Sequence, residues 1–207
     1  ASWQMKSDVK AYFLWFCLLS VGVFGFFISV DLFTMFLFYE VALIPMYLLI
    51  GVWGSGKKEY AAMKLTLMLM GGSALLLVGI LGIYFHSSTT GAFTMNLQEI
   101  AQAHAMPESL QRWFFPLVFT GFGVLGALFP FHTWSPDGHA SAPTAVSMLH
   151  AGVLMKLGGY GCFRVAIHLM PEAAKELSWI FIILTGISVV YGAYSAIVQT
   201  DLKYINA

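Results

Sequence analysis

Six long apolar stretches, separated by short polar segments, constrain this chain more than any other feature of its sequence. Each is close to the roughly 20 residues that an α-helix needs to cross the ~30 Å hydrocarbon core of a bilayer. They span residues 12–30, 32–52, 60–85, 112–131, 143–168 and 177–198. Only 10% of the 207 residues are charged, against about 25% in an ordinary soluble domain. The sequence therefore predicts an all-α, polytopic membrane protein, with six transmembrane helices in one domain over residues 1–207.

The remaining polar residues argue against several other classes of function. The net charge is zero and no basic stripe is present, which argues against a nucleic-acid partner. Cys17 and Cys162 lie in apolar runs and indicate neither a disulfide framework nor a metal cluster. No glycine-rich nucleotide loop or metal motif occurs, and the histidines are not spaced as ligands. We therefore expect no metal and no cofactor in this chain.

Basic residues give the orientation of the helices. If the spans alternate in direction, five lysines lie at one end and three basic residues at the other. These are Lys6, Lys10, Lys57, Lys58 and Lys203 against Arg112, Arg164 and Lys175. Short cytoplasmic segments carry an excess of Lys and Arg, so the five-lysine end is predicted to be cytoplasmic.

Two charged residues fall near the middle of predicted spans. Glu40 lies nine residues after Asp31, and Lys156 thirteen residues after Pro143; at 1.5 Å per residue Glu40 sits about 13 Å into its helix. A charge at this depth costs roughly 2.5–3.5 kcal/mol on insertion scales, and such residues normally face a bundle interior or water. Each could be a neutral or helix-joining group, or a proton carrier. We favour the second interpretation for both, since burial brings the pKa values of acids and amines toward neutrality.

Lys64 lies only one turn inside its span. Its long side chain can extend to water from there, so a structural role is the simpler interpretation. We nevertheless keep it as a candidate member of a proton relay.

Two prolines are predicted to break helices. Pro45 follows Glu40 by five residues and frees the carbonyl of Val41. Pro130 leads into a polar, proline-rich stretch, residues 130–144. This stretch is either a surface loop or an unwound segment that turns inward, as discontinuous helices do near the binding sites of transporters.

Three histidines follow Pro130 within or just beyond this stretch. His132 and His150 are candidate relay residues, whereas a structural role is favoured for His139. Lys156 is predicted to lie about 120° around the helix and ~9 Å along it from His150, so the two side chains could contact different neighbours or the same water chain at two depths. The remaining histidines are predicted to be solvated near span ends or in loops: His86, His104 and His168.

Several motifs, in order, resemble one family. Residues 38–47, FYEVALIPMY, resemble the fifth-helix motif of the antiporter-like subunits of respiratory complex I (NADH:quinone oxidoreductase). Residues 130–144 and 149–164 resemble its seventh and eighth helices, and residues 199–203 are similar to the segment after the ninth. The resemblance is closest to the subunit M, or chain 4, branch. It implies about 14 helices in two inverted repeats, of which this chain resembles helices four to nine, with the second repeat beginning in residues 168–207.

The resemblance also implies roles for individual residues. Glu40 matches the fifth-helix glutamate and Lys156 the eighth-helix relay lysine, while Lys203 is a candidate exit or link between repeats. One departure is clear: the seventh-helix lysine of the family has no counterpart in residues 121–128, which contain no ionisable side chain. We hypothesise that water bound near His132 and His150 covers the gap between Glu40 and Lys156.

The function implied is proton translocation as a subunit of the translocating enzyme NADH:quinone oxidoreductase, coupled to remote electron transfer. NADH, FMN, iron–sulfur clusters and quinone would be held by partner subunits. The expected partners are the lipid bilayer and other membrane subunits, including sister antiporter-like subunits, in a bacterial plasma membrane or, for an organellar chain, the mitochondrial inner membrane. Two alternatives remain: a subunit of a multisubunit cation/proton antiporter or membrane-bound hydrogenase, and a non-transporting scaffold.

Overall fold

Helices form all the regular elements in the part of the chain that the computed structural model describes. This part comprises residues 2–3, 8–87, 93–103 and 106–206. Lys6 and His104, which entered the predictions above, lie outside it. The first elements are α1 (Val9–Ile28), α2 (Leu32–Trp53), α3 (Lys58–Phe85), α4 (Leu97–Ala103) and α5 (Glu108–Leu125). The remaining ones are α6 (Trp134–Ser141), α7 (Thr144–Leu149), η1 (His150–Leu154), α8 (Met155–Gly161), η2 (Cys162–Ile167), α9 (Pro171–Val198) and α10 (Leu202–Asn206).

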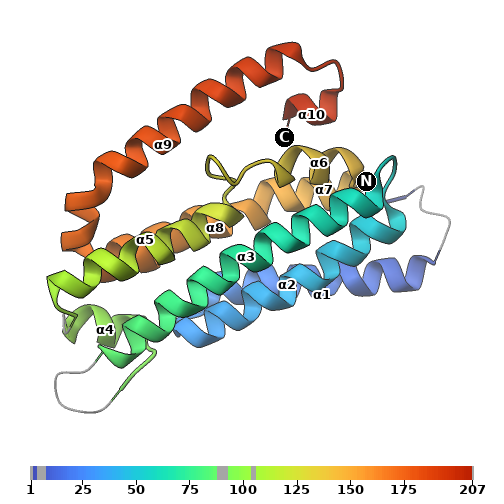
Figure 1. Ribbon diagram of the computed structural model, residues 1–207. Helices are drawn as coiled ribbons and strands as arrows, with labels where there is room; N and C mark the ends of the chain where they lie inside the picture. Colours follow the sequence, from blue (N-terminus) through green and yellow to red (C-terminus); the bar gives the residue numbers. More distant parts are fainter. Residues whose placement is uncertain (1, 4–7, 88–92, 104–105, 207) are drawn as a thin grey trace.

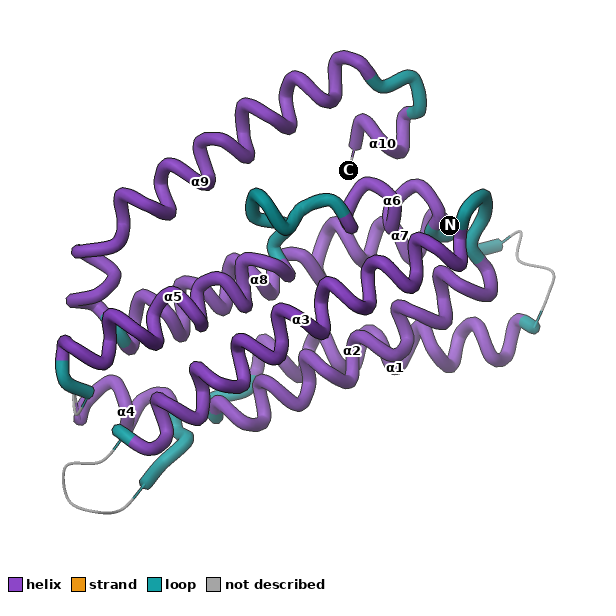
Figure 2. The backbone as a smooth tube through the Cα atoms, in the orientation of Figure 1, coloured by secondary structure: helices purple, strands orange, loops and turns teal. Residues whose placement is uncertain are grey.

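Long helices lie side by side in an elongated bundle (Figure 1). The turn between α1 and α2 is tight, as the single acid between two apolar runs predicts. The Asp31 carboxylate caps α2 by accepting a hydrogen bond from the Thr34 N–H at 2.9 Å, which satisfies one of the free N–H groups of the first turn. α3 packs between α2 and α5, so that the chain builds the bundle from sequential neighbours (Figure 2).

Four of the described helices are long and apolar enough to cross a membrane: α1, α2, α3 and α9. Of the other two predicted spans, one is interrupted and the other is helical throughout but not uniformly α-helical. The span predicted at residues 112–131 becomes α5, a run of turns over residues 126–133, and the short helix α6. The span predicted at residues 143–168 is a continuous rod in which α-helical and π-helical segments alternate.

The two prolines behave differently. α2 continues through Pro45 without interruption, so the predicted helix break is absent there. A proline lacks only one backbone donor, and buried neighbours on both sides, Leu43 and Met46, hold the helix in place. The break near Pro130 is present, but α5 already ends at Leu125, five residues earlier.

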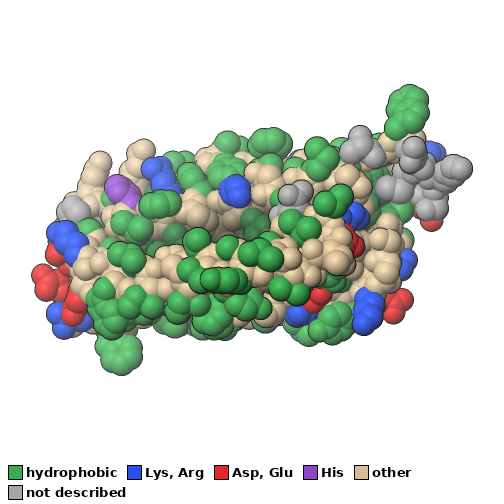
Figure 3. All heavy atoms as spheres, turned by 90° about the horizontal axis from the view of Figure 1, so that it is seen from above, with side chains coloured by type: hydrophobic (Ala, Val, Ile, Leu, Met, Phe, Trp, Pro, Cys, Tyr) green, Lys and Arg blue, Asp and Glu red, His purple; other side chains and the backbone are tan. Residues whose placement is uncertain are grey.

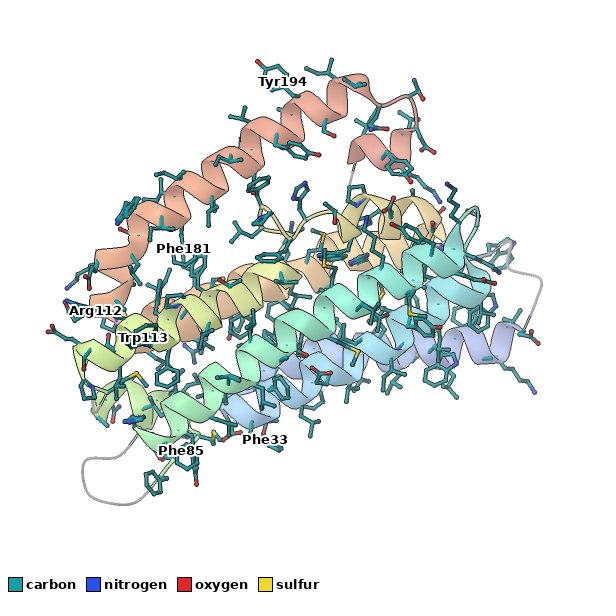
Figure 4. All side chains as sticks on the ribbon, in the orientation of Figure 1. Phe33, Phe85, Arg112, Trp113, Phe181 and Tyr194 are labelled. Carbon is teal, nitrogen blue, oxygen red and sulfur yellow. The ribbon has the colours of Figure 1, made fainter. Side chains whose placement is uncertain are left out.

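α9 stands apart from the bundle over much of its length (Figures 1 and 2). The first half of α9 packs against α5. Phe181 of α9 points toward α5 (Figure 4), and the centroids of the Phe181 and Phe119 rings lie 4.1 Å apart. Arg112 and Glu176 form an ion pair of 2.7 Å between the two helices. Tyr194, in the second half, points away from the bundle and is exposed.

Most charged side chains gather toward the two ends of the molecule, with a largely apolar surface between them (Figure 3). At one end, the Ser55 N–H donates to the Ser141 carbonyl at 2.8 Å, which places the loop containing Lys57 and Lys58 beside the end of α6. Lys203 reaches the same end, and Arg112 lies at the opposite one. This sorting of basic residues agrees with alternating spans.

Candidate functional site

Glu40 lies in the middle of α2 and is partly buried. Its Oε1 atom is buried and has no hydrogen-bond partner. The neighbouring Tyr39 hydroxyl donates to the Leu69 carbonyl on α3 at 3.0 Å, which fixes α2 against α3 at this level. Among the described residues, no cation forms an ion pair with Glu40. One carboxyl oxygen of Glu40 is therefore enclosed within the bundle, and the described residues supply no fixed counter-ion.

Lys64 is paired. Its Nζ lies 2.7 Å from Asp137 Oδ2 on α6, and both side chains are mostly buried, at 23% and 27% exposure. The Tyr204 hydroxyl of α10 donates to the other oxygen of Asp137 at 3.2 Å. Lys64 thus binds a carboxylate that α6 brings within its reach rather than only water, which agrees with a structural role; a part in the proton relay stays a prediction. Sequence reasoning did not select Asp137.

Lys203 holds the end of α6. Its Nζ donates to the carbonyl oxygens of Ala142 at 3.0 Å and Ala140 at 3.5 Å. The last carbonyls of a helix have no partners within it, and a cation there also interacts favourably with the helix dipole. The structure gives Lys203 a capping role; an exit or inter-repeat link remains a prediction.

His150 is fully buried and lies between two aromatic rings. Its imidazole stacks on the Trp134 indole, with centroids 5.3 Å apart, and on the His139 imidazole, with centroids 4.3 Å apart. Neither ring nitrogen has a hydrogen-bond partner in the described structure. His150 and Lys156 have different surroundings, since His150 is enclosed and Lys156 is exposed beside the cavity toward α9. The chain is π-helical here, and the Met155 N–H bonds to the His150 carbonyl.

His139, for which a structural role was favoured, is buried and has partners for both ring nitrogens. It is 3% exposed; its Nδ1 lies 3.0 Å from Ser147 Oγ and its Nε2 3.4 Å from Met155 Sδ. The only available signal was its place in the polar stretch after Pro130, which turns inward as α6 rather than lying on the surface.

His132 lies apart from this pair. It packs against Phe129 and against the ring of Tyr191 on α9, with centroids 4.8 Å apart. It lines a cavity of about 170 Å³ together with Ser135, Ser195 and Tyr204. A cavity of this volume with several polar groups in its walls can hold water. The hypothesis of water near His132 therefore has a suitable space.

Lys156 is exposed on α8 and lines a largely apolar cavity of about 530 Å³ between α5, α8 and α9. Lys156 lies on the side of α8 that borders this cavity, and a place in the interior of the whole bundle stays a prediction. The reason for this orientation is the close contact between α5 and α8: Gly158 and Gly161 occupy the side of α8 that faces Phe122, which turns Lys156 the other way. No hydrogen bond joins Lys156 to Glu40 or His150 among the described residues.

These features define a class: a polytopic α-helical membrane protein with ionisable side chains inside its bundle, a discontinuous helix and π-helical turns beside them. No group of three or more His, Cys, Asp or Glu residues that could hold a metal occurs in the described ranges.

Comparison with known proteins identifies the family. The sequence model described as NADH:quinone oxidoreductase/Mrp antiporter, transmembrane, matches residues 29–207. The chain belongs to this transmembrane family.

Relatives with curated names are similar over nearly the whole chain. NAD(P)H-quinone oxidoreductase chain 4 3 of Picosynechococcus sp. is 39% identical over 203 residues, which are 98% of this chain and 36% of the relative. NADH-quinone oxidoreductase subunit M of Rickettsia bellii is 38% identical over 208 residues, 98% of this chain and 40% of the relative. The chain thus spans about two-fifths of the length of these relatives.

Two solved structures contain similar chains. One is respiratory complex I from Thermus thermophilus with bound NADH, with a TM-score of 0.85 and 28% identity over 94% of this chain and 41% of that chain. The other is the membrane-bound sulfane sulfur reductase, an archaeal respiratory membrane complex, with a TM-score of 0.87 and 26% identity over 98% of this chain and 41% of that chain. The antiporter-like fold expected from the sequence is confirmed.

Proposed function

We propose that this chain is part of a proton-translocating membrane subunit of NADH:quinone oxidoreductase. The observation that carries the proposal is Glu40, an acid in the middle of a transmembrane helix with a buried oxygen that has no partner. A purely structural acid at this depth would be expected to be paired. The names of the relatives, subunit M and chain 4 of quinone oxidoreductases, support the same assignment.

In this proposal protons move through side chains and water at several depths. Glu40, His150 and Lys156 are separated, so water must bridge them, and His132 contributes through its cavity. Lys64 and Lys203 act at the end of the bundle where α6 terminates, the first through Asp137 and the second as a candidate exit or link. Residues 168–207 begin a second inverted repeat, and further helices of the whole protein cover the cavity beside Lys156.

The partners in this proposal supply the electron transfer. Other membrane subunits, including sister antiporter-like subunits, adjoin this one in the bilayer. NADH, flavin, iron–sulfur clusters and quinone are held by partner subunits, and electron transfer there changes the protonation of groups here.

Replacing Glu40 tests the proposal. Glu40→Gln in the full-length subunit of the assembled complex, reconstituted into vesicles, should lower the protons moved per NADH oxidised, because glutamine cannot exchange a proton. The measurement pairs NADH oxidation with quenching of a pH-sensitive dye. Glu59→Gln, an exposed acid in the first turn of α3, is the matched control and should behave as wild type. Unchanged pumping by assembled Glu40→Gln would instead favour the scaffold.

A second candidate function has the same fold but places the chain in a different membrane complex. The similarity to a chain of the sulfane sulfur reductase, at a TM-score of 0.87, shows that this fold also occurs in a complex with another name. Purification of the whole native complex discriminates the two: NADH-dependent quinone reduction supports the first proposal, and its absence from an intact complex supports the second.

A further inference from the structure

Two imidazole rings from different elements meet inside the bundle. His139 comes from α6, after the break, and His150 opens the π-helical segment η1. Their rings are stacked, with centroids 4.3 Å apart and planes inclined by 20°. A Cβ placed on Gly138 would lie 3.8 Å from His150 Cε1, an ordinary van der Waals distance, which places this part of α6 directly beside the ring.

The ring nitrogens of the two histidines differ in their hydrogen-bond partners. His139 is held in place by Ser147 and Met155, while both nitrogens of His150 are enclosed and unpartnered among the described residues. A buried polar group without a partner is unfavourable and is uncommon in native proteins. In a chain that handles protons, the free nitrogens of His150 are places where water or a proton can bind.

The surroundings allow at most one proton on the pair. The Trp134 face, 5.3 Å from the His150 centroid, stabilises a cation by cation–π attraction. Two imidazolium rings 4.3 Å apart would repel each other strongly in a medium of low dielectric constant. One charged ring between an indole and a neutral imidazole avoids this repulsion.

No charged group on the neighbouring elements stabilises a permanent positive charge on these rings. Asp137 on α6 is engaged by Lys64 of α3 and by Tyr204. Lys156 on α8 lines the cavity toward α9, and Glu40 on α2 has no ion-pair partner among the described residues. None of these four charged side chains bonds to either ring in the part of the chain that the structure describes.

We propose that His139 and His150 form one proton-holding site, in which Trp134 supplies the aromatic face and Ser147 and Met155 are positioning residues. A hydrated proton from the relay binds a free nitrogen of His150 and leaves from the same ring to water, so that only an N–H bond forms and breaks. The inference rests on the proposed function and adds His139, which no other observation assigns to the relay.

A double-mutant cycle tests the pair in the full-length protein of the assembled complex. His139→Gln, His150→Gln and the double variant are compared for protons moved per NADH oxidised. If the rings form one site, each single variant loses the same share of pumping and the double variant loses no more, since contacting residues act non-additively. His168→Gln, exposed beyond the end of η2, is the control and keeps wild-type pumping. Losses that multiply, or a His139→Gln variant equal to the control, would overturn the proposal.

A second comparison separates proton holding from packing. Lysine can carry a proton but does not reproduce the ring, whereas glutamine is neutral and similar in size. The proposal expects His150→Lys to retain more pumping per assembled complex than His150→Gln, and the reverse order contradicts it; the glutamine cycle decides if the lysine variant does not assemble. Loss of pumping by Glu40→Gln alongside normal pumping by both histidine variants would remove this inference and leave the proposed function intact.

Discussion

Asp137 joins three elements through one carboxylate. One oxygen binds Lys64 of α3 and the other accepts from Tyr204 of α10, while the backbone belongs to α6. Partial burial and the negative charge of Asp137 raise the pKa of Tyr204, so the phenol stays protonated and remains a donor at neutral pH. The position of the second half of the broken helix therefore depends on polar contacts.

Separating Lys64 from Asp137 should destabilise the subunit. Lys64→Met or Asp137→Asn leaves a mostly buried partner unpaired, at about 1.5–3 kcal/mol for a hydrogen bond to a charged group. The combined variant should lose less than the sum of the two, because it leaves neither charge alone. Thermal unfolding of the purified full-length protein measures this, with the exposed Lys57→Met as control. Strictly additive losses would show that the pair contributes little.

The residues of the candidate site could be predicted only in part. Glu40 could be selected from the sequence because an acid within a long apolar run is energetically costly and is usually functional. Asp137 was not, since it lies in a polar stretch where charge is unremarkable and its partner Lys64 is 73 residues away. The stacking of His139 on His150 likewise depends on how α6 packs against η1, which no local pattern encodes.

At the scale of elements, glycines set the distance between α5 and α8. A Cβ on Gly158 would overlap the backbone nitrogen of Gly126 and come within 2.6 Å of the Phe122 carbonyl oxygen, whereas one on Gly159 would meet nothing within 4 Å. Small residues allow close helix approach in membranes. The glycine-rich run in this helix suggested such packing, but only the structure separates the glycines that face α5 from those that do not.

Gly158→Ala should therefore weaken the α5–α8 contact, by about 1–3 kcal/mol as is typical of overpacking. Gly159→Ala on the same helix should be neutral or slightly stabilising, because alanine has the higher helix propensity. Thermal unfolding of the two variants provides the comparison. If the two variants unfold at the same temperature, the backbones of α5 and α8 can move apart without loss of stability.

The π-helical segments η1 and η2 could not be predicted from the hydrophobic pattern of the sequence. The apolar run from Pro143 to His168 predicts a spanning helix, and a continuous helical rod is present. Hydrophobicity carries no information on whether a carbonyl bonds four or five residues ahead, however. That choice decides the direction of His150 and of Lys156, and it is made by packing against α5 and α6.

At the scale of the whole molecule, composition and run length were sufficient to predict a polytopic helical membrane protein. The break in the fourth predicted span was expected from its proline-rich sequence. The separation of α9 from the bundle was not, because its apolar sequence has the same character as the buried helices, and only 6% of its most apolar window is covered here.

The orientation can be checked with two cysteines in the full-length protein, with Cys17 and Cys162 replaced. Ser55→Cys lies beside the lysine-rich loop and Ser109→Cys at the start of α5, and both positions are exposed. The charge rule predicts that an impermeant maleimide labels the first only from the cytoplasmic face and the second only from the opposite face. The reverse pattern would invert the assigned topology, and labelling of both from one face would contradict alternating spans.

The indole of Trp134 touches both halves of the interrupted region at once. Its Nε1 donates to the Val124 carbonyl at the end of α5, at 3.1 Å, and its face covers His150. If His150 holds a proton as proposed, a shift of α5 against α6 would strain either this hydrogen bond or the aromatic cover of the imidazole. Trp134 would then couple helix displacement to the charge on that ring.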